Sequence, residues 1–130
     1  MPGTRSQPGN ICDSCQGYSS SAVTGGQILF EYVANAFQRI TGVKFLAVTA
    51  GSGAGNTVGD VLLNGTSIWS NAANKPTLLG TATGEFNNSR PDPNAQNLRP
   101  GDRLTLQIAS IPATTGHARV TSNITFEANA

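Results

Sequence analysis

Two segments in the last third of the chain alternate apolar and polar residues with a period of two. In residues 103–111 the apolar positions are Leu104, Leu106 and Ile108, and the polar positions between them are Arg103, Thr105 and Gln107. In residues 117–128 the apolar side holds Ala118, Val120, Ile124 and Phe126, and the polar side holds His117, Arg119, Thr121, Asn123, Thr125 and Glu127. Because successive side chains of a strand point to opposite faces, this pattern predicts two half-buried strands of an antiparallel sheet.

A β-hairpin is predicted around Asn64-Gly65. These two residues separate the apolar run 61–63 from residues 66–69, which end in Trp69. Asn and Gly tolerate the positive φ angles of a type I′ turn, whose twist matches that of the strands it joins. We therefore expect residues 58–69 to form two paired strands.

Residues 28–40 fit two interpretations. Their apolar positions follow a helical stripe, and Thr24 and Gln27 have the spacing of a capping box. Gly25 and Gly26 would, however, occupy the first turn of such a helix, and β-branched and aromatic residues are dense after them. We predict two strands broken near Asn35, with a single helix as the alternative.

Two further strands complete the pattern. One strand is predicted over residues 41–48, with Val43, Phe45 and Ala47 on the same face. A weaker pattern predicts another strand over residues 78–86. Prolines and asparagines in residues 87–101 predict a long loop that ends in a turn at Pro100-Gly101-Asp102. About seven strands with these turn signals predict an all-β, antiparallel, jelly-roll-like sandwich over residues 28–130.

Residues 1–27 are predicted to form an extended N-terminal arm. Repeated Gly and Pro interrupt this segment, and it shows no periodicity. Such an arm is either disordered or ordered only against a partner. Its apolar side chains are the groups that a partner could bury, and we predict that they bind the partner: Ile11, Cys12, Cys15 and Tyr18.

Charged residues are scarce in this chain, and their low number excludes several classes of protein. Charged residues make up 12% of the 130 residues, about half the usual share, and the formal net charge is +1. The basic excess of a nucleic-acid-binding protein is missing. No apolar run approaches the roughly 20 residues that span a bilayer, and the N-terminus lacks the apolar core of a signal peptide. We therefore expect no nucleic-acid or membrane partner, and a surface of small neutral groups suited to contact with other subunits.

The two cysteines form a Cys12-Asp13-Ser14-Cys15 motif within the arm. A redox motif would open a helix beside a strand, which this Gly/Ser-rich context does not predict. A zinc site would need two more ligands, and His117 is the one histidine, so Cys12 and Cys15 could bind zinc only between chains. An incidental thiol pair or a local disulfide is the main prediction.

No catalytic or cofactor-binding residues are predicted. The lone His117 cannot be placed in a nucleophile–base arrangement from the sequence, and a solvated or hydrogen-bonded ring is the simpler interpretation. Asp60, Asp92 and Asp102 lack the regular spacing of a calcium loop. We therefore predict that the protein is not an enzyme, with a small enzyme as the least favoured alternative.

Three stretches of residues 37–127 carry a resemblance to a known group of proteins. FQRITGVKFLAVTAGSGAGNTVGDVLLNGTSIW, LRPGDRLTLQIASIP and HARVTSNITFE resemble small β-sandwich proteins encoded among the structural genes of tailed bacteriophages. That group includes capsid cement or decoration proteins and head-fibre or fibre-tip knobs. The shared features are ITGV-x-F at the start of a strand, the V-x-DVL-x-NGTSI hairpin and a late GDRLTL strand. The CxxC motif in the arm departs from this pattern.

The resemblance implies a virion component without catalytic activity, often trimeric, whose N-terminal segment attaches it to the particle. We accordingly expect a cement protein that binds the assembled capsid and stabilises it. Its partner would be the major capsid protein or another virion protein, and it would be made in the host cytoplasm and located on the capsid surface. The alternative is a fibre tip or carbohydrate-binding adhesin, for which Trp69 could stack on a sugar if it is not part of the core.

Overall fold

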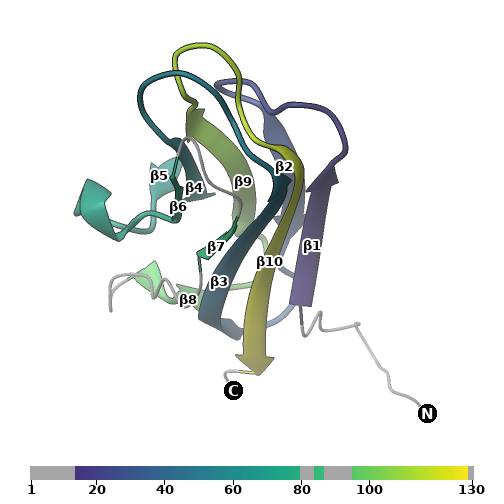
Figure 1. Cartoon of the computed structure of the whole chain (residues 1–130). Coiled ribbons are helices and arrows are strands. Elements are labelled where there is room, and N and C mark those ends of the chain that lie inside the picture. Colours follow the sequence, from purple (N-terminus) through teal and green to yellow (C-terminus); the bar gives the residue numbers. More distant parts are fainter. Residues whose placement is uncertain (1–13, 80–83, 87–94, 129–130) are drawn as a thin grey trace.

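The computed structural model describes residues 14–79, 84–86 and 95–128, with the backbone alone for residues 84–86. In these residues two five-stranded sheets pack face to face (Figure 1). Sheet A comprises β1 (Ser14–Ser19), β3 (Gln38–Thr49), β7 (Gly84–Phe86), β8 (Asn97–Leu98) and β10 (Ala118–Ala128). Sheet B comprises β2 (Ile28–Val33), β4 (Thr57–Leu63), β5 (Thr66–Ser67), β6 (Thr77–Leu78) and β9 (Arg103–Ser110). A 3₁₀ turn, η1 (Ala72–Asn74), precedes β6.

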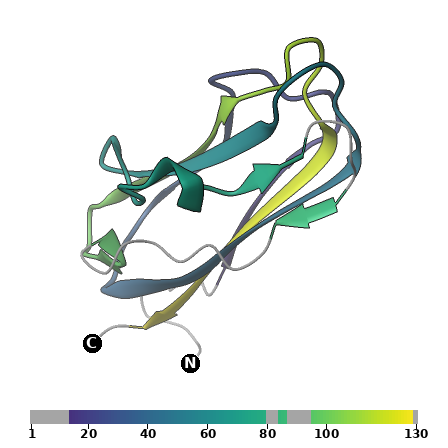
Figure 2. The same ribbon diagram turned by 60° about the vertical axis from the view of Figure 1, so that its left-hand side comes forward.

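The strand order places the longest strands next to one another. Sheet A runs β1-β10-β3-β7, with β8 pairing with β3, and sheet B runs β2-β9-β4-β5, with β6 pairing with β4. Every pairing is antiparallel. Figure 2 shows the two layers from the side. The prediction of an antiparallel β-sandwich is confirmed.

The local turn signals are confirmed in detail. Asn64 and Gly65 have φ angles of 52° and 89° and join β4 to β5, as a type I′ turn requires. Gly101 has a φ of 95° in the turn before β9. Residues 28–40 form β2 and the start of β3 with a break at residues 34–37, so the two-strand interpretation is confirmed.

Two predictions need correction in the region between the hairpin and β9. The weak strand expected over residues 78–86 is two short strands in opposite sheets, because β6 pairs with β4 and β7 pairs with β3. The loop expected over residues 87–101 contains β8, which pairs with the start of β3. All three short strands exist through long-range pairing rather than through a local apolar pattern.

The arm predicted over residues 1–27 differs from the structure in its second half. Residues 14–19 form β1, which pairs with β10 along its whole length. Its inward positions are the small residues Cys15, Gly17 and Ser19, and β2 packs closely on Gly17. A Cβ on Gly17 would lie 2.9 Å from Cβ of Leu29. The boundary at residue 27 therefore falls inside the sandwich, while residues 1–13 lie outside the described residues.

The core lies between the two sheets and has the predicted faces. Sheet A contributes Val43, Phe45 and Ala47, and sheet B contributes Leu104, Leu106 and Ile108, all of them buried. Phe45 packs directly over the backbone of Gly59 in β4, where a Cβ would lie 2.2 Å from the ring. Thr105 departs from expectation, since it points away from the core and is nevertheless only 9% exposed. In the part of the chain that the structure describes, no helix is long and apolar enough to cross a membrane.

Candidate interaction surface

The outward face of sheet A brings together side chains from three strands that are distant in sequence. Tyr18 of β1 lies opposite Thr121 of β10, and Thr121 lies opposite Leu46 of β3. Val48 lies two residues beyond Leu46 on the same face of β3. Tyr18 is 60% exposed, Val48 55% and Leu46 41%. Three large apolar side chains therefore meet solvent on one open sheet.

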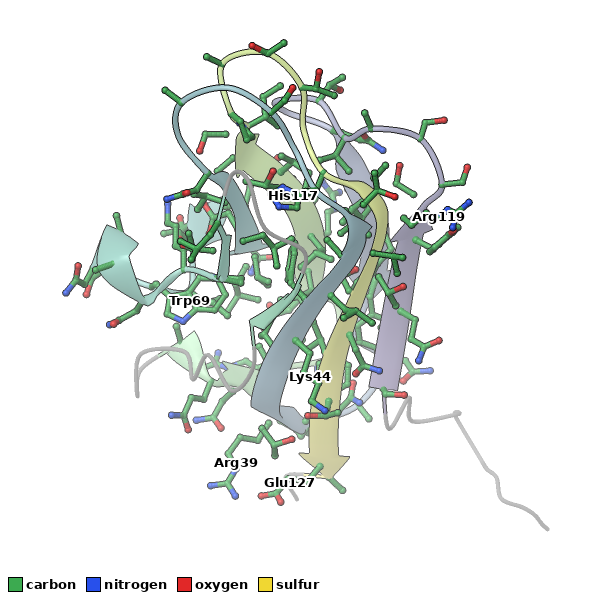
Figure 3. All side chains as sticks on the ribbon, in the orientation of Figure 1. Arg39, Lys44, Trp69, His117, Arg119 and Glu127 are labelled. Carbon is green, nitrogen blue, oxygen red and sulfur yellow. The ribbon has the colours of Figure 1, made fainter. Side chains whose placement is uncertain are left out.

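Two cations flank these apolar side chains. Lys44 lies opposite Asn123, two residues before Leu46 on β3, and Arg119 is exposed at the start of β10. Both are exposed, and neither forms an ion pair with a side chain that the structure describes. Figure 3 shows Lys44 over the middle of β3 and β10 and Arg119 beside the end of β1. We call Tyr18, Lys44, Leu46, Val48, Arg119 and Thr121 the outer patch.

Arg119 has an unusual backbone conformation for a residue in a strand. Its φ angle is 51°, in the left-handed region. That region costs a residue with a side chain roughly 1–2 kcal/mol. The other described non-glycine residue with positive φ is Asn64, where the type I′ turn requires it. No turn explains the conformation of Arg119, and strain of this kind concentrates at functional sites.

The rest of this face is mostly neutral and polar. Gln16, Asn123 and Lys44 form one cross-strand row, and the hydroxyls of Thr41 and Thr125 lie 2.9 Å apart nearer the end of β10. Asn123 Oδ1 is buried and has no hydrogen-bond partner among the described residues. At the far end of the face Arg39 forms an ion pair with Glu127 (Figure 3). Glu85 of β7 takes the register position beside Leu46.

The predicted partner-binding residues are divided by the structure. Tyr18 is exposed and belongs to the outer patch. Cys15 lies in β1, half-buried, and packs against the hydrophobic core. Ile11 and Cys12 lie outside the described residues. The sequence pattern singled out Tyr18 but not Leu46 and Val48, because only the strand order places them near it.

His117 is buried rather than at the solvent-facing start of a strand, as its place in the alternation suggested. Its ring is 0% exposed, with Nδ1 2.7 Å from Oγ1 of Thr57 and Nε2 2.9 Å from the carbonyl oxygen of Leu79. A carbonyl can only accept, so Nε2–H donates to Leu79 and Nδ1 accepts from the Thr57 hydroxyl. Both ring nitrogens are therefore occupied in joining residue 117 to the start of β4 and to the residue after β6.

The aspartates considered for calcium belong to separate networks. Asp60 lies 3.1 Å from Nζ of Lys75 and accepts a hydrogen bond of 2.7 Å from Ser67. Asp102 accepts from Asn64 and from the backbone N–H of Arg99, and these hydrogen bonds lower the pKa of its carboxyl group. Asp92 lies outside the described residues. Within the described ranges, no group of three or more His, Cys, Asp or Glu side chains could hold a metal ion.

Comparison with known proteins supports the architecture. No known family matches the sequence, and no curated protein is similar to it. The structure is similar to a chain described as "Capsid of Ralstonia phage GP4", with a TM-score of 0.54 and 18% sequence identity. The similarity covers 97% of this chain and 92% of that chain. The two proteins therefore share a fold over nearly their whole lengths.

Proposed function

We propose that this protein is a non-enzymatic structural component of a virion that binds the assembled capsid and stabilises it, as cement or decoration proteins do. The observation that carries the proposal is the fold shared over 97% of the chain with a protein of a phage capsid. The partner is the major capsid protein or another virion protein, and the protein lies on the capsid surface after synthesis in the host cytoplasm.

The described surface supports a role in protein contact rather than in catalysis. The one histidine is enclosed in the core, and Asp60 and Asp102 each serve a local structural network. The outer patch, in contrast, exposes large apolar side chains on an open sheet. Apolar side chains beside polar and cationic ones are typical of surfaces that meet another protein.

Binding to capsids tests the proposal directly. Particles of the encoding phage that lack this chain are mixed with the purified protein, and sedimentation measures how much protein is bound. We expect saturable binding at a fixed number of copies per particle, and a higher temperature of genome release from the decorated particles. An absence of binding contradicts the proposal. Light scattering on the purified protein tests whether it is the homotrimer that we also propose.

Truncation tests whether residues 1–13 attach the protein. Deleting residues 1–13 leaves the described strands in place, and we expect the melting temperature to change little while binding to particles weakens. Deleting residues 1–27 also removes β1 and the buried Val23, so that variant should melt at a lower temperature. Full binding by the shorter truncation would assign attachment to the sandwich alone.

The cysteines have a separate test. If Cys12 and Cys15 are an incidental pair, chelating zinc and replacing both by serine should leave attachment unchanged. Loss of attachment after both treatments would instead indicate a zinc site between chains.

The alternative of a carbohydrate-binding fibre tip has less support. Its predicted stacking residue, Trp69, is 2% exposed and belongs to the core. A ring enclosed in this way cannot stack on a sugar without local unfolding. Glycan-array binding by the isolated protein, with no binding to capsids, would favour this alternative.

A further inference from the structure

We infer that the outer patch of sheet A is the surface that docks on the capsid, and that the docking partner presents acidic side chains around an apolar contact. The inference rests on the proposed function and identifies which face performs it. The apolar part comes from Tyr18, Leu46 and Val48, and the acidic partners would face Lys44 and Arg119.

The first argument is the placement of charge. Four residues, or roughly 13 Å of strand, separate Arg119 from Asn123, the residue opposite Lys44. Along the strands Leu46 lies between these two cations, and Val48 lies level with Arg119. Neither cation has an ion-pair partner among the side chains that the structure describes, whereas Arg39 and Lys75 do. Acidic groups on a partner would complement both cations and fix the register of the contact.

The second argument is the backbone of Arg119. The left-handed φ of 51° is unfavourable for arginine and would suit glycine. Nothing within the described fold requires an arginine there, since its side chain is exposed and forms no ion pair with a described residue. A contact outside the chain would account for an arginine at such a position.

A contact between this face and the same face of a second copy fits less well. In a two-fold symmetric contact each patch would meet its own copy. Close packing of the two apolar regions would bring the cations of both copies into the same contact, and like charges oppose it. An acidic surface on a different protein avoids that repulsion, and we therefore assign the patch to the capsid.

Charge reversal tests the assignment with a matched control on the opposite sheet. Lys44→Glu and Arg119→Glu should each weaken binding to depleted particles by about tenfold or more, and added salt should weaken wild-type binding. Arg103→Glu makes the same change on the outward side of β9 in sheet B and should bind within twofold of wild type. The inference is overturned if the two sheet A variants bind like wild type, or if all three variants weaken equally. If the wild-type chain itself does not bind, the proposed function fails and the inference fails with it.

Zero-length crosslinking identifies the partner group itself. A carbodiimide joins an amine to a carboxylate in direct contact, so decorated particles should yield a Lys44 peptide linked to an Asp or Glu of a capsid protein. Lys44→Arg keeps the charge and removes the reactive amine, so this variant should bind but lose the crosslink. The inference is contradicted if Lys44 is not crosslinked and if an amine-acetylating reagent modifies it to the same extent in free and in bound protein.

Replacing Arg119 by glycine separates binding from folding. Arg119→Gly relieves the left-handed φ, so its melting temperature should be at least that of wild type. Its binding to particles should nevertheless weaken, because the cation is lost. A glycine variant that is stable and binds fully would refute the role of Arg119.

Discussion

Gly59→Ala should be strongly destabilising although it adds a single methyl group. The new Cβ would lie 2.2 Å from Cζ of Phe45 and 2.5 Å from Cε2. Non-bonded carbons rest about 3.5–4.0 Å apart, so the ring must retreat by more than about 1 Å. Phe45 is 0% exposed and lies between two sheets, so it has no open space to enter. We expect the free energy of unfolding to fall by about 2–3 kcal/mol.

Urea unfolding followed by tryptophan fluorescence measures this effect, since Trp69 is in the core. The midpoint should fall by roughly 1–2 M at an unchanged slope. Gly42→Ala in β3 is the matched control, because its Cβ would meet only Oγ1 of Thr125 at 3.4 Å. That control should change the free energy of unfolding by no more than about 0.5 kcal/mol.

A compensating change sharpens the test. Phe45→Leu shortens the side chain over Gly59 and alone should cost about 1–2 kcal/mol. Combined with Gly59→Ala, it should give a double variant that is more stable than the sum of the single effects by about 1 kcal/mol. Strict additivity, or a Gly59→Ala variant as stable as wild type, would show that the two sheets are not in contact at this point.

Three further predictions concern the core and the loops. Leu106→Ala should reduce the free energy of unfolding by about 2–5 kcal/mol in urea titrations, because it removes a buried side chain. Thr105→Ala should reduce it by at most about 1 kcal/mol, through loss of the hydrogen bond to Glu31. Equal effects would contradict the assignment of Leu106 to the inward face of β9 and of Thr105 to the outward face. His117→Ala should cost about 2–4 kcal/mol in the same assay, because it leaves a cavity and two unpaired polar partners; a cost below about 0.5 kcal/mol would contradict its buried position. The pKa of Asp102 is lowered in the folded state, so its contribution to stability is present above its ordinary pKa and is lost as pH falls through the folded value. The melting temperatures of Asp102→Asn and wild type should therefore converge at acidic pH. A difference that stays constant with pH would refute this linkage.

The strands that the sequence predicts well are those whose signals are local. The Asn64-Gly65 turn and the alternation around Leu106 depend on residues close to one another, so the pattern contains the information. The break near Asn35 follows from the same local reasoning. These signals were sufficient to predict the sandwich.

The missed elements depend on distant partners. β1 has small inward residues and no apolar alternation, and it is a strand because β10 supplies its hydrogen bonds. The outer patch could not be predicted either, since Tyr18 and Leu46 become neighbours only when β10 lies between their strands. Arg119 gave no sequence signal, because its strain appears only in the backbone angles.

The central position of β10 in sheet A has a consequence for synthesis. β10 is the last of the described strands in sequence order, yet it separates β1 from β3. While the ribosome is still adding β9, sheet A lacks its centre, and β1 has no strand to pair with. Contacts between such distant segments also form slowly. Each nascent chain therefore exposes part of its future core until translation has passed β10, and a chain with a formal net charge of +1 has little charge repulsion to oppose association with other chains during that interval.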